Sequence, residues 1–114
     1  MAVPKKVLKL VQARDSHCYH CGLEEDLVPH HRINRGMGGS ALLDTPDNLI
    51  QVCAAWNFYM ESDAEMASTA RGWNHKLPLW ESLELPVFDR SEFRWYFLSP
   101  DGTRVESHWK DQAF

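Results

Sequence analysis

Apolar and charged residues at the start of the chain follow the spacing of a short amphipathic helix. Val7, Leu8 and Val11 fall on one stripe between lysines, as in a helix that packs one face on a core. Pro4 suits the first helical position, because its fixed φ is already helical and no N–H partner is needed there. The pattern predicts an N-terminal helix over residues 4–14.

Two short apolar runs, at residues 27–32 and 49–53, predict a pair of strands. The segment between them, 33–47, contains three glycines and a proline and predicts a loop. Before the first strand, residues 16–23 predict a tight turn around two cysteines.

The segment after the second strand predicts a helix over residues 54–70. We expect a break near Ser62 and Asp63, because an aspartate at that point can accept hydrogen bonds from the first turn of a second helical segment. The two segments would then form two consecutive helices.

The stretch past Gly72 is rich in aromatic residues, which favour extended structure. Segments 93–98 and 103–107 flank the tight-turn sequence Ser-Pro-Asp-Gly and predict a β-hairpin. We expect the aromatic side chains of this stretch to pack in the core and the sheet rather than to stack on nucleic-acid bases. They are Trp80, Phe88, Phe93, Trp95, Tyr96 and Phe97.

These elements place the chain in the α+β class, as one domain over residues 1–114. The chain is 44% hydrophobic and can bury a modest core, although chains of this length often gain stability from a bound metal. No apolar run is long enough to span a membrane, and the N-terminus lacks a secretory signal. We expect a soluble, cytoplasmic protein whose three cysteines are reduced and favour metal binding over disulfides.

The net charge of −4 is unfavourable for binding nucleic acid, but the basic residues are concentrated near the N-terminus. Residues 1–35 carry six basic and four acidic side chains, whereas residues 36–114 carry six basic and twelve acidic ones. Phosphate binding depends on the local field, so Lys5, Lys6 and Lys9 are candidates for binding DNA. The same lysines are equally well explained as the solvated face of the first helix.

A Cys-x-x-Cys pair, Cys18 and Cys21, places two thiols in one tight turn, where both can bind a tetrahedral ion such as Zn²⁺. Cys53 is a third candidate ligand. Trp56 stands where a second such pair would place the fourth cysteine. Either a nearby histidine completes the site, or the thiols are small buried hydrophobes without a metal. The candidate histidines are His17 and His20.

Two adjacent histidines, His30 and His31, lie near the end of the first predicted strand. Neighbouring side chains on a strand point to opposite faces, so we expect different roles for them. One would bind a metal ion and the other would remove a proton from water. Asn57 lies early in the predicted helix and is placed to contact the same ion, although asparagine near a helix start is also a common cap.

In their order along the chain these residues resemble the motif of the HNH endonuclease family, in the small form found in actinobacteria and their tailed phages. The resemblance covers residues 15–75 and includes Glu61 and Ser62 after the last motif residue. It implies a ββα-metal core to which a helix, a Cys-x-x-Cys knuckle and a C-terminal β-hairpin over about residues 80–110 are added. The matching segments are 18–21, 29–32, 35–39, 47–50 and 52–57.

The resemblance implies a role for each motif residue. His31 matches the general base, His30 the metal ligand beside it, and Asn48 the residue that steadies the base and the loop. Asn57 takes the place of the final histidine, and its amide oxygen suits Mg²⁺ or Mn²⁺. Two neutral ligands leave the cation its full charge but hold it weakly, so we expect low metal affinity without DNA.

Arg32 and Arg35 flank the implied base and are candidates for clamping the scissile phosphate. The alternative is that they form ion pairs with Asp44, Asp47 or Glu61. The glycine-rich segment after Arg35 would let the backbone approach DNA closely.

Two departures from the family pattern stand side by side. Trp56 replaces the usual fourth cysteine, and Asn57 replaces the usual histidine. They indicate either a tolerated variant of the motif or a degenerate copy that has lost activity.

The sequence therefore predicts a metal-dependent endonuclease that hydrolyses or nicks DNA, with Mg²⁺ or Mn²⁺ at the catalytic site and Zn²⁺ as a candidate structural ion. The resemblance implies a phage protein that acts in the host cytoplasm beside the DNA-packaging terminase. Two alternatives stay open. One is a non-catalytic module that binds DNA or protein on the same scaffold, and the other is a structural zinc-binding adaptor.

Overall fold

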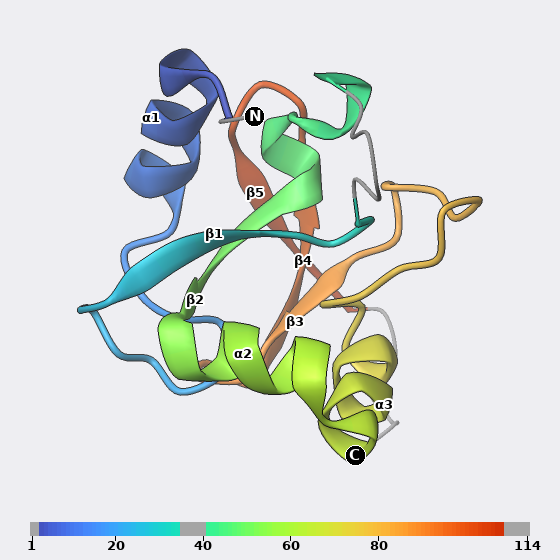
Figure 1. The fold of residues 1–114 in the computed structure, drawn as a ribbon. Helices are drawn as coiled ribbons and strands as arrows, with labels where there is room; N and C mark the ends of the chain where they lie inside the picture. Colours follow the sequence, from blue (N-terminus) through green and yellow to red (C-terminus); the bar gives the residue numbers. More distant parts are fainter. Residues whose placement is uncertain (1–2, 35–40, 109–114) are drawn as a thin grey trace.

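The computed structural model describes residues 3–34 and 41–108 of the chain (Figure 1). The fold is α+β, as the sequence predicts, with three helices and two antiparallel sheets in the described residues. Two 3₁₀ turns, Ala41–Leu43 and Pro46–Asn48, precede the second strand. The helices and strands in chain order are α1 (Lys5–Arg14), β1 (Leu27–His31), β2 (Leu49–Cys53), α2 (Ala54–Ser62), α3 (Ala64–Gly72), β3 (Val87–Asp89), β4 (Arg94–Leu98) and β5 (Arg104–Ser107).

The first sheet is the antiparallel pair β1–β2, and β2 runs directly into α2. Its register pairs His30 with Ile50 and His31 with Leu49. All five residues of β2 are buried. In Figure 1 this hairpin lies between α1 on one side and α2 with α3 on the other. The two histidines therefore lie at the end of β1, opposite the start of β2.

The second sheet has the order β3-β4-β5, and one core joins it to the first. Ile50 and Val52 of β2 share that core with Val87 of β3 and Leu98 of β4. Apolar burial at about 25 cal/mol per Å² makes such a shared core the main source of stability. The C-terminal strands thus support the hairpin that carries the histidines.

Most of the predicted elements agree with the structure. The N-terminal helix, both strands of the first hairpin and the later β4–β5 hairpin lie within one or two residues of their predicted positions. The predicted break in the long helix is confirmed at Asp63, whose side chain accepts hydrogen bonds from the N–H groups of Glu65 and Met66. This cap separates α2 from α3.

The structure departs from the sequence prediction at two points in the aromatic stretch. The short strand β3 was not predicted as a separate element, and it turns the expected hairpin into a three-stranded sheet. Phe88 and Trp95 are buried, but the side chain of Trp80 is 85% exposed and that of Phe93 is 72% exposed. The expectation that these aromatic residues pack in the core and the sheet therefore fails for Trp80 and Phe93, which lie outside the strands, whereas Phe97 lies in β4 and is 43% exposed.

The helices are short, with ten residues in α1 and nine each in α2 and α3. None of the helices in the described ranges has the length and apolar character that crossing a membrane requires. Their length suits the packing of one apolar face on the shared core.

Candidate functional site

A polar pocket of about 250 Å³ opens where β1 ends and α2 begins. The β1–β2 pairing places both histidines at this end of the hairpin, and the first turn of α2 brings in Asn57. Three of the sequence-predicted residues, one from α2 and two from β1, thus meet at one cavity. The described residues that line it are Pro29, His30, His31, Asn34, Asn57 and Glu61.

His30 is buried between a backbone carbonyl and the side chain of Asn57. Its Nε2 lies 2.8 Å from the carbonyl oxygen of His75, and its Nδ1 lies 3.3 Å from Oδ1 of Asn57. Burial is the largest cause that lowers the pKa of His30, to about 4, so the ring is neutral at pH 7. A carbonyl accepts only, so Nε2 carries the hydrogen and the lone pair of Nδ1 faces the amide oxygen of Asn57. Two acceptors that face each other form a natural pair of cation ligands.

His31 has a different partner from its neighbour. Its Nε2 donates to Oδ1 of Asp44 at 2.8 Å, and the Asp44 side chain is almost completely buried whereas that of His31 is partly exposed. A carboxylate in this position fixes the ring orientation and the tautomer, which leaves Nδ1 as the basic nitrogen. Sequence reasoning considered Asp44 only as an ion-pair partner for an arginine, and no spacing signal connects it to His31.

Asn48 is buried and closes the two ends of the loop between β1 and β2. Its Oδ1 accepts from the backbone N–H of Ile33 at 2.8 Å, and its Nδ2 donates to the carbonyl oxygens of Ile33 and Leu43. These bonds hold the chain just after His31 against the turn that carries Asp44. Asn48 therefore steadies the loop ends around the histidine.

The position of Arg32 requires a correction. The expected phosphate clamp is 1% exposed, and its guanidinium donates to the carbonyl oxygens of Asn74, Asp47 and Leu85 at 2.7–3.1 Å. Burial lowers its pKa to about 10. A guanidinium with three backbone acceptors cannot reach a phosphate without breaking them, so Arg32 fastens segments of the fold together. The strand ends at His31, one residue earlier than expected, and the chain turns Arg32 inward.

The other proposed DNA contacts do not line this pocket. Lys5, Lys6 and Lys9 are exposed on α1, and Figure 1 shows α1 well separated from α2, the helix that contains Asn57. Arg35 and the glycine-rich segment after it lie outside the described residues.

The three cysteines come together as a second candidate site. Ligand atoms of Cys18, Cys21 and Cys53 all lie within 4.8 Å of one another, and the Cys21 and Cys53 sulfurs are 3.7 Å apart. Gly22 has φ +80°, a left-handed conformation that favours glycine, and its N–H donates to the carbonyl oxygen of Cys18. This turn positions the first two thiols. The structure thus offers a cluster of three thiols that could bind a metal ion.

The ionisation of these thiols differs with their surroundings. Burial raises the pKa of Cys18 to about 11. Burial also acts to raise the pKa of Cys21, but hydrogen bonds from the backbone N–H of Leu23 and from the two neighbouring thiols outweigh it and lower that pKa below its usual value. A metal ion would replace the thiol protons at such a cluster.

Neither predicted histidine supplies a fourth ligand. The ring of His20 stacks on Trp56 with their centroids 4.0 Å apart, and Nε2 of His17 lies 2.7 Å from a carboxylate oxygen of Asp89. Trp56 itself fills the core and donates its backbone N–H to the Cys53 sulfur at 3.4 Å. In the described part of the chain the cluster has three ligands and one exposed thiol, that of Cys21.

A third group, not anticipated from the sequence, contains His17, Asp89 and Glu92 with ligand atoms within 4.8 Å of one another. Arg104 already donates to both carboxylates at 3.1 Å. Its guanidinium supplies the positive charge that a cation would supply, so the group is best explained as an ion-pair network that fastens β3 and β5 to the turn after α1.

Comparisons with family models, with curated proteins and with solved structures found no match for this chain.

Proposed function

We propose that this protein is a metal-dependent endonuclease of the HNH type, which hydrolyses or nicks phosphodiester bonds in DNA. One observation carries the proposal. His30, His31 and Asn57 line a single polar pocket at the end of a β-hairpin that leads into a helix, and Asp44 holds the ring of His31. The order β1, β2, α2 is also the order that a ββα-metal core requires.

The cation ligands in this proposal are Nδ1 of His30 and Oδ1 of Asn57, with the carboxylate of Glu61 on the same pocket wall. Nitrogen and oxygen donors of this kind suit Mg²⁺ or Mn²⁺. A divalent cation bound here would neutralise charge on the phosphate and on the departing 3′ oxygen. Glu61 enters the sequence analysis only as part of the motif; its carboxylate lines the same pocket and pairs with Nζ of Lys76 at 3.1 Å.

His31 is the general base in this proposal. Its Nδ1 takes a proton from a water molecule, and the oxygen of that water forms a new bond to phosphorus. The bond from phosphorus to the 3′ oxygen breaks, and the departing oxygen takes up a proton from solvent. Asp44 stabilises the imidazolium that forms, because its carboxylate already accepts from Nε2.

Zn²⁺ at the three cysteines would have a structural role and take no part in the cleavage step. The cluster joins the turn at Cys18 and Cys21 to Cys53, the residue that caps α2. A structural ion there would fix the start of α2 and, one turn later, Asn57.

Plasmid relaxation with Mg²⁺ or Mn²⁺, with and without a chelator, tests the proposal. We expect cleavage that the chelator abolishes and that His31→Ala loses, while the matched control His108→Ala, an exposed histidine just after β5, keeps it. Activity that persists in His31→Ala would contradict the mechanism. Absence of cleavage with every metal, together with retained DNA binding, would favour the non-catalytic module.

A further inference from the structure

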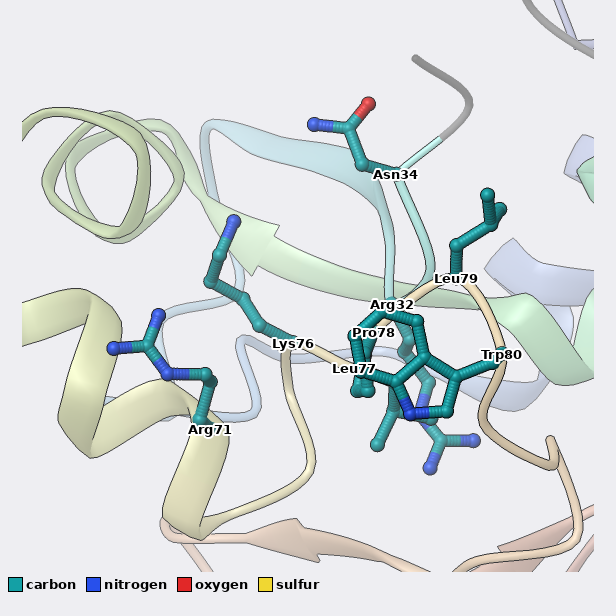
Figure 2. A pocket seen from close by; sticks show the side chains of 8 residues that line it. All are labelled: Arg32, Asn34, Arg71, Lys76, Leu77, Pro78, Leu79 and Trp80. Atoms are coloured by element: carbon teal, nitrogen blue, oxygen red, sulfur yellow. The ribbon is translucent and has the colours of Figure 1, made fainter.

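A larger pocket of about 690 Å³ adjoins the polar pocket. One wall is the end of α3 and the segment after it, and the other is the chain that follows β1 (Figure 2). The two walls are joined by a parallel bridge between Ile33 and Leu77 and by a hydrogen bond from the Leu77 N–H to the Arg32 carbonyl oxygen. The described lining residues are Arg32, Asn34, Arg71 and 76–80.

The two pockets adjoin each other through one shared residue and one ion pair. Asn34 lines both of them. Lys76 lines the larger pocket, and its Nζ lies 3.1 Å from Oε1 of Glu61, which lines the smaller one. The two pockets therefore adjoin at Asn34 and at the Lys76–Glu61 pair.

Besides the buried Arg32, two cations line the larger pocket, and one of them, Lys76, is paired with Glu61 of the polar pocket. Arg71 and Lys76 line it, and no carboxylate does so among the described residues. Figure 2 shows their side chains reaching in the same direction on one side of the pocket. In a protein of net charge −4 this local excess of cations favours a phosphate-bearing ligand.

The opposite side of the pocket is apolar and uncovered. The side chains of Leu79 and Trp80 are 73% and 85% exposed, and Figure 2 shows the indole of Trp80 across from the two cations. An indole so exposed contributes little to the core. Beside two cations, it matches the pattern by which proteins bind single strands, in which aromatic rings stack on bases and cations follow the backbone.

We propose that this pocket, here called the Trp80 pocket, binds an unpaired nucleotide of the DNA strand whose phosphate occupies the polar pocket. The indole of Trp80 stacks on the base, while Arg71 and Lys76 contact the adjoining phosphates. The inference rests on the proposed nuclease function and narrows its substrate to single-stranded or locally opened DNA.

Fluorescence anisotropy of a labelled oligothymidine strand, in buffer with a chelator so that cleavage plays no part, tests the Trp80 pocket. We expect Trp80→Ala to weaken binding about tenfold, Trp80→Phe to retain most of the affinity, and Arg71→Gln to weaken binding and reduce its salt dependence. Phe97→Ala, at an exposed aromatic of β4 on the other sheet, is the matched control. Because Trp80 is exposed, its variants are expected to keep the native circular dichroism spectrum.

Equal affinities for the wild type, Trp80→Ala and Phe97→Ala would overturn the inference. So would a fully paired duplex that binds as tightly as the single strand, or a loss in Trp80→Ala that appears with RNA and not with DNA. These outcomes are separable from the failure of the nuclease proposal, which His31→Ala tests through cleavage. A chain that binds the strand through Trp80 but never cleaves would keep the Trp80 pocket and lose the catalytic assignment.

Discussion

The carbonyl oxygen of His75 lies 2.8 Å from Nε2 of His30, so the turn after α3 fixes the ring of the proposed metal ligand. His75 is itself held on both sides. Its Nδ1 accepts from Nε1 of Trp56, and its Nε2 donates to the carbonyl oxygen of Phe88 in β3. The C-terminal sheet, for which the sequence indicated no role, thus supports the candidate site through one buried histidine.

The two buried histidines predict that the protein loses stability in mild acid. Burial lowers the pKa of His75 to about 3 and that of His30 to about 4, whereas both titrate near 6.5 in the unfolded chain. Between these pKa values and 6.5 the unfolded state binds more protons than the folded state. The free energy of unfolding therefore has its full value above pH 6.5. It falls as the pH decreases, by up to about 1.4 kcal/mol per pH unit for each histidine.

Denaturant unfolding from pH 7.5 to pH 4.5, at fixed metal content, measures this loss. The variant His75→Gln is expected to be less stable at neutral pH, since it disturbs two buried hydrogen bonds, but to show a shallower decline with pH. An unfolding midpoint that does not move over this range in the wild type would contradict the prediction.

A prediction for Asp44 follows from its contact with His31. In Asp44→Asn the carboxylate that orients the ring and stabilises its protonated form is lost, so we expect cleavage to fall on the order of 10- to 100-fold. The metal concentration that gives half-maximal activity should stay unchanged. The matched control Asp101→Asn, which changes an exposed turn residue, should keep full activity. Cleavage by Asp44→Asn at the wild-type rate, or a loss that a lower Tm of the variant accounts for, would contradict the prediction.

How far the sequence determined the site depends on the kind of signal each residue carries. Cys18 and Cys21 are local in sequence, and a hairpin followed by a helix brings Cys53 and Asn57 to them and to the histidines, so these groupings could be anticipated from spacing. The contact between Asp44 and His31 could not be anticipated, because it depends on the path of the long loop between β1 and β2. The exposure of Trp80 could not be predicted either, because the identity of an aromatic residue does not reveal whether its side chain is buried or exposed.

For Arg32 the sequence predicted a contact with phosphate, but the side chain is buried and holds the fold together. This structural role predicts a loss of stability when the guanidinium is removed. Because the buried Arg32 guanidinium donates to three backbone carbonyl oxygens, Arg32→Met should cost about 2–4 kcal/mol of unfolding free energy. The exposed Arg71→Gln should cost almost none. Denaturant unfolding compares the two directly. An Arg32→Met variant that is stable but has lost DNA affinity would instead support the prediction that Arg32 clamps the scissile phosphate.

Asn57 provides a test of the cation ligands. Asn57→Ala removes the amide oxygen that faces Nδ1 of His30, and we expect it to raise the Mn²⁺ concentration needed for half-maximal cleavage by at least about tenfold. Asn57→His supplies a stronger nitrogen ligand and should increase the rate at low Mn²⁺. If the amide instead rotates to donate from its nitrogen to His30, with no cation involved, both variants will leave the metal dependence unchanged.

The zinc content of the cysteine cluster can be measured independently of cleavage. Three thiols within reach of one ion predict about one zinc per chain by elemental analysis of protein purified without a chelator. Cys21→Ser exchanges the exposed thiol, whose loss leaves the buried pair intact, and should reduce the zinc content and the Tm together. Adding a chelator to the wild type should lower its Tm to the value of the variant. Protein that contains no zinc, with a Tm that neither treatment changes, would show that the three thiols pack as small apolar groups.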